Sequence, residues 1–315
     1  MRYSKVITAH NIMLATVSVL IILSALITIG MLTPLLIKLM TGVDITMDMQ
    51  YFNNRTAPIA AVLAILLAMC MLVGHATSRT ISVIAGVTLS ISILFVLVSP
   101  FKSTPIDAMV PIIIPAIVIT LYRMYRSLDR DSMLRSLRGV SVHLIHLGIL
   151  LLIIGTVLST NMKVEDSDIL YLGTEHSFDG QHYSLKVVDM ESGYEGMPYQ
   201  NYPGSSYVTT IDLEVYRRGE YFDSAQVKYI TDFKWGQTYT TTYIKRGLLE
   251  ELFIAPRTLD EPTGRVDMYV RTVPFIMLVW GGMWMLVIGI LIFGIVEYTK
   301  EGRELDKTTC HKDVS

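Results

Sequence analysis

Two histidines, His143 and His146, lie three residues apart inside a nearly unbroken apolar segment that runs on to Thr160. On a helix, this spacing places both imidazoles on adjoining parts of one face, about one turn apart. Ionisable residues inside a membrane-spanning segment are rare, and they are functional candidates by default. A neutral imidazole there either bonds a carbonyl or hydroxyl of a neighbouring helix or ligates a metal, most commonly haem iron. Residue type alone favours the hydrogen bond.

The composition is typical of a multi-span membrane protein that also carries some soluble mass. Apolar residues make up 51% of the 315 residues, charged residues 17%, and the mean hydropathy is +0.47. The net charge of -2 comes without a basic patch, which argues against nucleic-acid binding. Cys70 and Cys310 form neither a Cys-x-x-Cys motif nor the Cys-x-x-Cys-His motif of covalent haem attachment. A thiol–disulfide catalyst and a c-type haem are therefore not expected.

Six apolar segments are long enough to cross a bilayer as helices, and a polar region separates the fifth from the sixth. We expect these helices at about residues 12–37, 57–73, 80–98, 106–122, 140–160 and 274–295. Residues 1–160 then form a five-helix membrane domain, residues 161–271 an extracytoplasmic β-rich domain, and residues 296–315 a cytoplasmic tail. The expected fold class is an α-helical multi-pass membrane protein with one small, mainly-β domain between helices five and six.

The distribution of basic residues predicts the orientation of the chain in the cell membrane. The loop after the fourth helix is the most basic, and the short segments on its side of the membrane carry twelve lysines and arginines: Arg2, Lys5, Arg79, Arg123, Arg126, Arg130, Arg135, Arg138, Lys300, Arg303, Lys307 and Lys312. The short segments on the other side carry only Arg55 and Lys102, with Lys38 at the boundary. By the positive-inside rule, both termini are cytoplasmic. His146 then lies roughly 10 Å along its helix from the inner end, in the inner half of the bilayer.

The polar region at residues 161–271 is predicted to form a series of strands. Residues 211–215 alternate apolar and acidic side chains, as in a strand with one buried face, and residues 217–220 form a turn to a second strand at 221–230. Residues 182–188 and 266–272 have the same character, while residues 248–254 fit either a helix or a strand. Residues 190–206 mix Gly, Pro and Tyr, which predicts a long loop and a contact surface. His176 and His182 are interpreted as surface residues of this domain.

The last apolar segment contains Trp280, Gly281 and Gly282 in its outer half. Glycines let another helix approach closely, and tryptophan suits the depth of a membrane interface. We therefore expect these residues to pack a helix, near the group bound by the histidines or near a partner chain.

Four stretches, taken in order, resemble the C-terminal part of the cytochrome c biogenesis family CcmF, the membrane subunit of the haem lyase in the Ccm pathway (system I). They are His10-Asn11-Ile12-Met13-Leu14 with Gly30 and Thr33-Pro34, then Tyr51-Phe52-Asn53 with Pro58, then His146-Leu147-Gly148 with Gly155, and last Pro274 with Trp280-Gly281-Gly282. Each motif is weak by itself, whereas the ordered set covers nearly the whole chain.

The resemblance implies that His146 is one axial ligand of a transmembrane b-type haem, with His143 as the alternative ligand or a supporting group. In that family the second axial ligand comes from an N-terminal half that has no counterpart here, and the Trp-rich haem-handling segment is missing too. The chain thus resembles one part of a split CcmF.

A split CcmF implies a set of partners. A separate N-terminal CcmF chain would supply the Trp-rich segment and the second ligand. The resemblance also implies the haem chaperone CcmE, apocytochrome c as substrate, and CcmH- and CcmI-like subunits. The complex would attach haem to apocytochrome c, the b haem would keep the delivered iron reduced, and this chain would be inactive alone. The sequence identifies no catalytic residue.

The alternative is a histidine-containing membrane transport or binding component without haem. The segment at 106–122 contains Pro111 and Pro115, and the kink expected there fits a transporter. Against this, no charged residue lies well inside a predicted span, whereas proton-coupled transporters usually have one.

Overall fold

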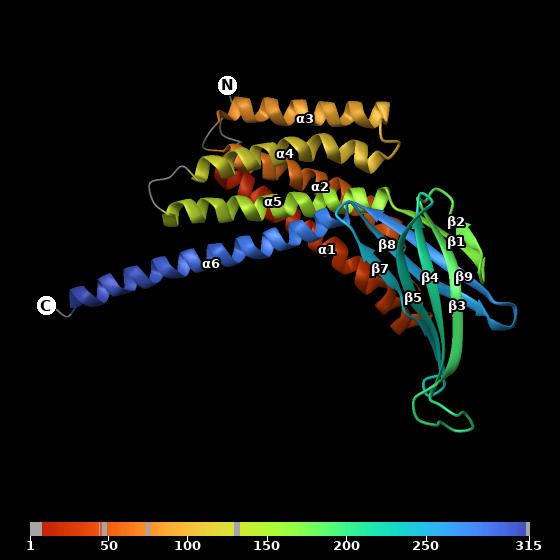
Figure 1. Cartoon of the computed structure of the whole chain (residues 1–315). Helices are drawn as coiled ribbons and strands as arrows, with labels where there is room; N and C mark the ends of the chain where they lie inside the picture. Colours follow the sequence, from red (N-terminus) through yellow and green to blue (C-terminus); the bar gives the residue numbers. More distant parts are fainter. Residues whose placement is uncertain (1–7, 44, 46–48, 74–75, 129–132, 313–315) are drawn as a thin grey trace. The chain divides into compact units, whose positions relative to one another are not determined.

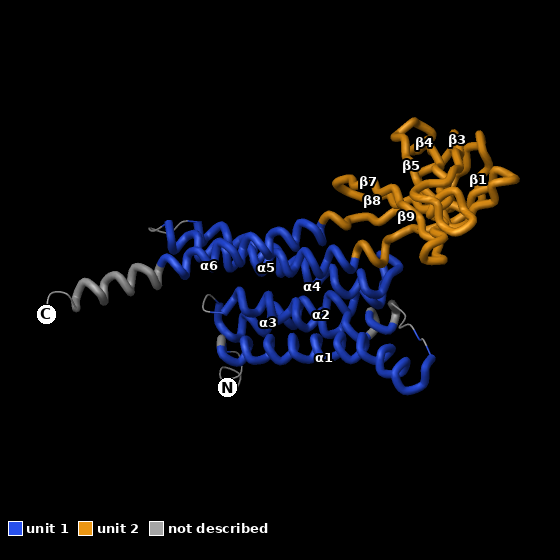
Figure 2. Tube along the Cα trace, turned by 90° about the horizontal axis from the view of Figure 1, so that it is seen from below, with its two compact units in different colours: residues 1–157, 278–315 blue, residues 158–277 orange. Residues whose placement is uncertain are grey.

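The computed structural model describes residues 8–43, 45, 49–73, 76–128 and 133–312, and it divides into two compact units (Figures 1 and 2). Unit 1 comprises residues 1–157 and 278–315, and unit 2 comprises residues 158–277. Unit 1 contains six helices that are long and apolar enough to cross a membrane, and the β-rich unit 2 is inserted between the fifth and the sixth. The expected fold class is therefore confirmed. Arg2, Lys5 and Arg130, which helped to orient the chain, lie outside the described residues.

The helices extend beyond the apolar segments into the polar sequence around them. They are α1 (Ala9–Thr41), α2 (Met49–Leu72), α3 (Ser78–Val98), α4 (Thr104–Leu128), α5 (Met133–Asn161) and α6 (Ile276–Lys312). The largest difference from the expected bounds is in α6, which continues through the region assigned to a separate tail. Glu, Lys and Arg are good helix formers, so a change from apolar to charged residues ends the span without ending the helix.

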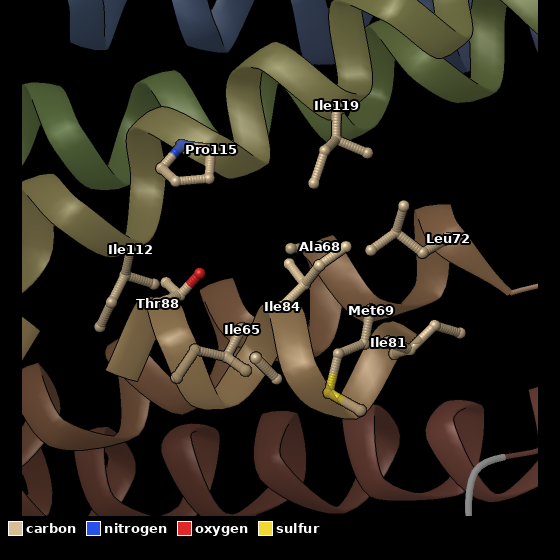
Figure 3. Close-up of a pocket in the computed structure, with 11 residues that line it drawn as sticks. Ile65, Ala68, Met69, Leu72, Ile81, Ile84, Thr88, Ile112, Pro115 and Ile119 are labelled. Carbon is tan, nitrogen blue, oxygen red and sulfur yellow. The ribbon is translucent and has the colours of Figure 1, made fainter. Parts of the chain in front are cut away.

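Helices α1 to α4 pack through α2, which contacts α1, α3 and α4. A pocket between α2, α3 and α4 is lined almost entirely by aliphatic side chains, with Thr88 as the only hydroxyl among its lining residues (Figure 3). Pro115 contributes to the wall from α4, which is traced as one helix through both of its prolines. Because the lining carries no charged group, this pocket does not suit a charged substrate.

A buried carboxylate, which sequence reasoning did not single out, organises the start of α4. Asp107 is fully buried, and its carboxylate accepts hydrogen bonds from Ser99 Oγ (2.8 Å) and from the Phe101 backbone N–H (3.0 Å). Its negative charge lies in the first turn of α4, where the helix dipole favours it. The carboxylate therefore ties the α3–α4 loop to α4.

Unit 2 is a sandwich of two antiparallel sheets, with strand orders β1-β9-β8-β7 and β2-β3-β4-β5-β6. The strands are β1 (Val164–Tyr171), β2 (Glu175–Ser177), β3 (Tyr183–Glu195), β4 (Ser206–Arg217), β5 (Glu220–Asp232), β6 (Gln237–Thr240), β7 (Tyr243–Arg246), β8 (Glu250–Asp260) and β9 (Arg265–Pro274). Buried residues from both sheets form one core, among them Leu185 and Leu213 from one sheet and Ile254 and Met268 from the other. This is the pattern of inward-facing residues that two stacked sheets require.

The strand predictions hold with one correction. Ile211, Leu213 and Val215 are buried in β4 as their alternation predicts, and Arg218 and Gly219, both with positive φ, form the two-residue turn to β5. The expected loop at 190–206 is wrong over its first part, because β3 continues to Glu195. A β-bulge after Val187 shifts the alternation, and the strand residues beyond it are mostly exposed, so no burial period reveals them.

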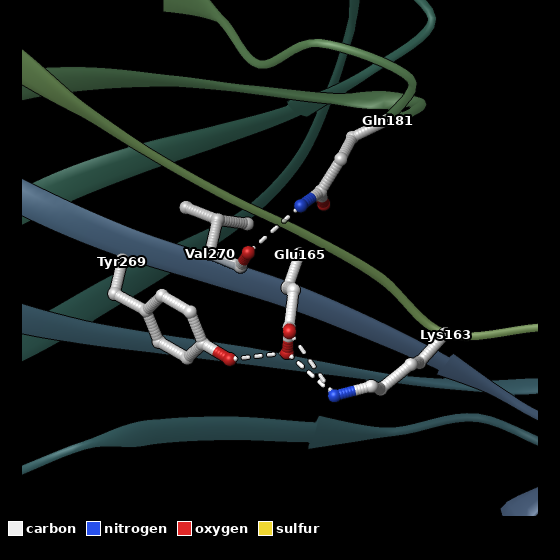
Figure 4. Close-up of polar contacts among 5 residues, drawn as sticks. All are labelled: Lys163, Glu165, Gln181, Tyr269 and Val270. Atoms are coloured by element: carbon white, nitrogen blue, oxygen red, sulfur yellow. Dashed lines mark hydrogen bonds and ion pairs between the residues drawn. The ribbon is translucent and has the colours of Figure 1, made fainter. Parts of the chain in front are cut away.

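Polar contacts reinforce the sandwich within and between its sheets (Figure 4). The Glu165 carboxylate of β1 accepts from Tyr269 OH of β9 (2.8 Å) and pairs with Lys163 (3.0 Å), which together lower the pKa of Glu165. Gln181, next to β3, donates its side-chain N–H to the Val270 carbonyl of β9 (2.8 Å) and so links the two sheets.

A second link between the sheets is centred on Glu261, in the turn between β8 and β9. Its carboxylate accepts hydrogen bonds from Ser192 Oγ (2.7 Å), Tyr207 OH (3.0 Å) and Thr209 Oγ1 (2.5 Å) of the other sheet. Burial alone would raise the pKa of Glu261, but the three hydroxyl donors outweigh it, and the pKa lies below its ordinary value.

Replacement of Glu261 by Ala is therefore expected to loosen the sandwich in a pH-dependent way. A carboxylate whose pKa is lower in the folded state contributes stability above its unfolded pKa, near 4.3, and loses it as the pH falls through the folded pKa. At pH 7 we expect the unfolding midpoint of unit 2 to fall by about 5 °C, with a smaller difference from wild type below about pH 4. Thermal unfolding of the full-length protein measures the midpoint, hydrogen exchange around Ser192 and Thr209 locates the change in unit 2, and Glu220→Ala is the surface control. An equal effect of both substitutions would contradict the proposed link.

Candidate functional site

The two histidines lie on the side of α5 that faces away from α6. His143, only 7% exposed, shares a buried stripe with Leu147, Leu150 and Ile154, which follow it at helical spacing. His146 lies on the flank of this stripe and is half-buried. The spacing thus places both imidazoles on one side of α5, as expected. The two differ in burial, because His143 is buried and His146 is half-buried.

A hydrogen bond within α5 determines the chemical state of His146. Its Nδ1 lies 2.7 Å from the carbonyl oxygen of Val142, one turn earlier. Because a carbonyl only accepts, Nδ1 carries the proton, and the neutral imidazole keeps its lone pair on Nε2. Metal-binding histidines are commonly oriented by such a bond from their other nitrogen. In His146, this bond leaves Nε2 as the ring nitrogen with a lone pair for a bound group.

Helices α5 and α6 form a close antiparallel pair through small residues spaced seven apart. These are Ser141, Gly148 and Gly155 on α5 and Gly282 and Gly289 on α6. A Cβ atom built on Gly148 would lie 2.7 Å from the Gly282 carbonyl oxygen, and one built on Gly282 would lie 2.7 Å from the Gly148 carbonyl oxygen. Small residues allow membrane helices to approach at this distance. Near the start of α5, Arg138 Nε pairs with the Glu297 carboxylate at 3.4 Å.

The residues of the Trp280-Gly281-Gly282 motif face different sides of α6. Gly282 contacts α5, whereas a Cβ atom built on Gly281 would meet nothing within 4 Å. Trp280 is 40% exposed. On α5, the contact point Gly148 lies about 160° around the helix from His146. Gly282 therefore supports α5 from behind the histidines and does not share a surface with them.

Unit 1 contains further histidines besides His146. His143 lies on the same side of the same helix, so it would not hold a bound group from the side opposite His146. His10, at the start of α1, is exposed, and His75 lies outside the described residues. Among the residues that the structure describes, no group of three or more His, Cys, Asp or Glu side chains is placed to hold a metal ion.

The two histidines of unit 2 have surface positions, as expected. His176 Nε2 pairs with the Asp168 carboxylate of β1 at 2.8 Å. His182 is exposed and lines a small pocket whose wall combines the polar residues Gln181, Glu250 and Thr272 with apolar residues such as Val164 and Pro274. Glu250 in this pocket is held by Tyr183 OH (2.9 Å), and burial together with that bond raises the pKa of Tyr183 to about 12.

Comparison with known proteins gives a fold and no sequence family. No protein-family model and no curated protein matches the chain. Its structure is similar to that of Cytochrome c Heme Lyase CcmF, with a TM-score of 0.68 and 15% sequence identity over 91% of this chain and 46% of that one. The chain thus spans about half the length of the protein it matches. The CcmF-like fold that the ordered motifs predicted is confirmed.

Proposed function

We propose that this chain is a membrane subunit of a cytochrome c haem lyase and that it acts together with a separate N-terminal CcmF-type chain. The supporting observation is the fold similarity to CcmF, with a TM-score of 0.68 over 91% of this chain. In this proposal, the Trp-rich haem-handling segment belongs to the companion.

In this proposal, His146 would bind the iron of a b-type haem that is shared with the companion chain. The Val142 carbonyl holds the proton on Nδ1 and leaves Nε2 for the iron. The companion would supply the second ligand, because His143 lies on the same side of α5 as His146. His143 instead helps to pack α5 beside the ligand. When bound, the haem would pass electrons from a separate electron donor to the iron of the delivered haem and so keep that iron ferrous.

The attachment reaction itself needs thiols positioned against vinyl groups and iron in the correct oxidation state. We assign this chain to positioning and to electron transfer. The haem reaches the companion from the chaperone CcmE, and apocytochrome c, with CcmH- and CcmI-like subunits, approaches from the side of unit 2. This requires unit 2 to be extracytoplasmic and the α4–α5 loop, with Arg126 and Arg135 beside it, to be cytoplasmic.

Deletion of the gene for this chain tests the function directly. Covalently bound haem survives denaturing electrophoresis, whereas b-type haem does not. We therefore expect haem-stained c-type cytochromes to disappear from the gel while spectra of b-type cytochromes persist. Re-expression of the chain restores staining, and re-expression of the companion alone does not. Normal c-type cytochromes in the deletion strain would rule out the proposal.

A further inference from the structure

The distal half of β3, from Asp189 to Glu195, has an open backbone edge. β2 pairs with β3 only from Ser184 to Lys186, and an isolated bridge from Leu172 covers Val187. From Asp189 onward β3 pairs with β4 on one side, and on its other side no strand of the described chain pairs with it. Figure 1 shows β3 continuing to the loop that leads into β4. We call residues 189–195 the β3 edge.

The hydrogen bonds identify which backbone groups face outward. The Met190 N–H donates to its neighbour's carboxylate, Asp189 Oδ1, at 2.8 Å, which indicates that this N–H faces away from β4. Successive residues of an antiparallel ladder direct their N–H and C=O groups to alternate sides. The backbone groups of Ser192 and Tyr194 therefore also face the open side. These residues are exposed, and the β3 edge contains neither the lysine nor the proline with which edge strands commonly prevent pairing.

The β3 edge lies at one end of the sandwich within unit 2. Ser192 contacts Glu261, so the edge lies at the end of the sandwich where β8 turns into β9. The strand ends that continue into the membrane helices, Val164 of β1 and Pro274 of β9, lie at the opposite end of the same sheet. The edge thus points away from the residues through which unit 2 is joined to α5 and α6.

The side chains of the β3 edge carry negative charge, which favours pairing with a strand that contains basic residues. Met190 packs toward the core and Ser192 toward Glu261, so the alternating residues Asp189, Glu191 and Glu195 lie on the solvent face. Lys228 of β5 lies 3.9 Å from Glu195 and offsets part of this charge.

A second copy of this chain is a poor occupant of the same edge. Antiparallel pairing centred on Ser192 would place Asp189 of one copy opposite Glu195 of the other, and like charges directly opposite destabilise a sheet. An extended segment with alternating lysines or arginines would place opposite charges there.

We propose that the β3 edge binds an extended, basic segment of a partner protein as an additional strand of the sheet. Main-chain hydrogen bonds to Ser192 and Tyr194 supply affinity, and lysines or arginines at alternate positions face the three carboxylates. This docking is independent of haem binding, so either proposal can fail without the other.

The test uses the full-length chain in detergent micelles and two fluorescent peptides of about nine residues, each alternating threonine or valine with a charged residue. One peptide carries lysine at the charged positions and the other carries glutamate. We expect the lysine peptide to bind at least about ten-fold more tightly and to slow hydrogen exchange at the Ser192 and Tyr194 amides.

Two variants separate strand addition from simple attraction between charges. Ser192→Pro removes an outward N–H and is expected to weaken binding of the lysine peptide at least about ten-fold. Ser192→Ala keeps that N–H, loses only the hydroxyl, and is expected to bind like the wild type. The double substitution Glu191→Lys and Glu195→Lys is expected to reverse the preference toward the glutamate peptide.

Three results would overturn the proposal. The first is tight binding of the lysine peptide that neither Ser192→Pro nor the charge reversal changes. The second is protection that appears elsewhere in unit 2. The third is protection of Ser192 that rises with protein concentration without peptide, which would assign the edge to a second copy of the chain.

Discussion

Substitution of His146 by alanine is expected to abolish the b-type haem spectrum of the complex between this chain and its companion, whereas His143→Ala is expected to retain it. The physical reason is the Val142 bond, which leaves Nε2 of His146 as the available lone pair. His143 is buried in the packing of α5, so its loss lowers the yield of folded complex more than the haem bound per folded complex. Reduced-minus-oxidised visible spectra, normalised to the purified complex, measure both effects.

A rescue experiment separates ligand loss from misfolding. In His146→Gly, added imidazole occupies the vacated position and is expected to restore the b-type spectrum, which it does not do in a complex that has simply failed to fold. A spectrum lost only with His143→Ala would reassign the ligand to His143. An unchanged spectrum in both variants would exclude α5 as the source of the ligand.

Much of the fold follows from the sequence because the membrane imposes strict demands on it. A membrane-spanning helix requires about twenty apolar residues, and all of its backbone groups must be hydrogen-bonded within it. The six helices can therefore be predicted from hydropathy alone. The alternation of apolar and acidic residues at 211–215 likewise predicts a strand, because one face of β4 is buried and the other is not. In β3 beyond Val187 neither face is buried, so the sequence shows no alternation of apolar and polar residues. Only the pairing with β4 identifies this part of the strand.

The candidate site was predictable in type but not in detail. The sequence placed both histidines on one side of a helix, but their different burial depends on which neighbours α5 meets. The role of Asp107 depends on a loop that folds back onto the start of α4, which no local pattern encodes. Similarly, Gly281 and Gly282 are equivalent as residues, and only the rotation of α6 about its axis decides which one faces α5. The seven-residue spacing from Gly282 to Gly289, matched by Gly148 and Gly155, was the available signal.

The α5–α6 contact connects this packing to the histidines. α6 supports α5 on the side opposite His146, so any force that separates the two helices also moves the helix that carries the candidate ligand. Coordination requires a ligand to be held within a fraction of an ångström, and that precision depends on rigid supporting elements. The glycines of α6 are therefore expected to influence haem binding without contacting the haem.

Alanine substitutions at Gly282 and Gly281 are expected to change stability in opposite directions. At Gly282 the new Cβ atom would lie 2.7 Å from the Gly148 carbonyl oxygen and 2.8 Å from the Leu152 nitrogen, both backbone atoms. Neither atom moves without shifting α5, so the substitution is expected to cost about 1–3 kcal/mol. At Gly281 the new Cβ atom meets nothing within 4 Å, and the helix gains about 0.5–1 kcal/mol because alanine has less backbone freedom to lose than glycine.

The opposite signs make this pair of substitutions a sharp test of how α6 is rotated against α5. Thermal unfolding of each variant in the same detergent, followed by the fraction that remains monodisperse after heating, measures the difference. The b-type spectrum of the complex should weaken with Gly282→Ala and stay unchanged with Gly281→Ala, because only the first displaces α5. If Gly281→Ala destabilised the protein and Gly282→Ala did not, α6 would face α5 with its other side. His146 would then lack the support on which its proposed role depends.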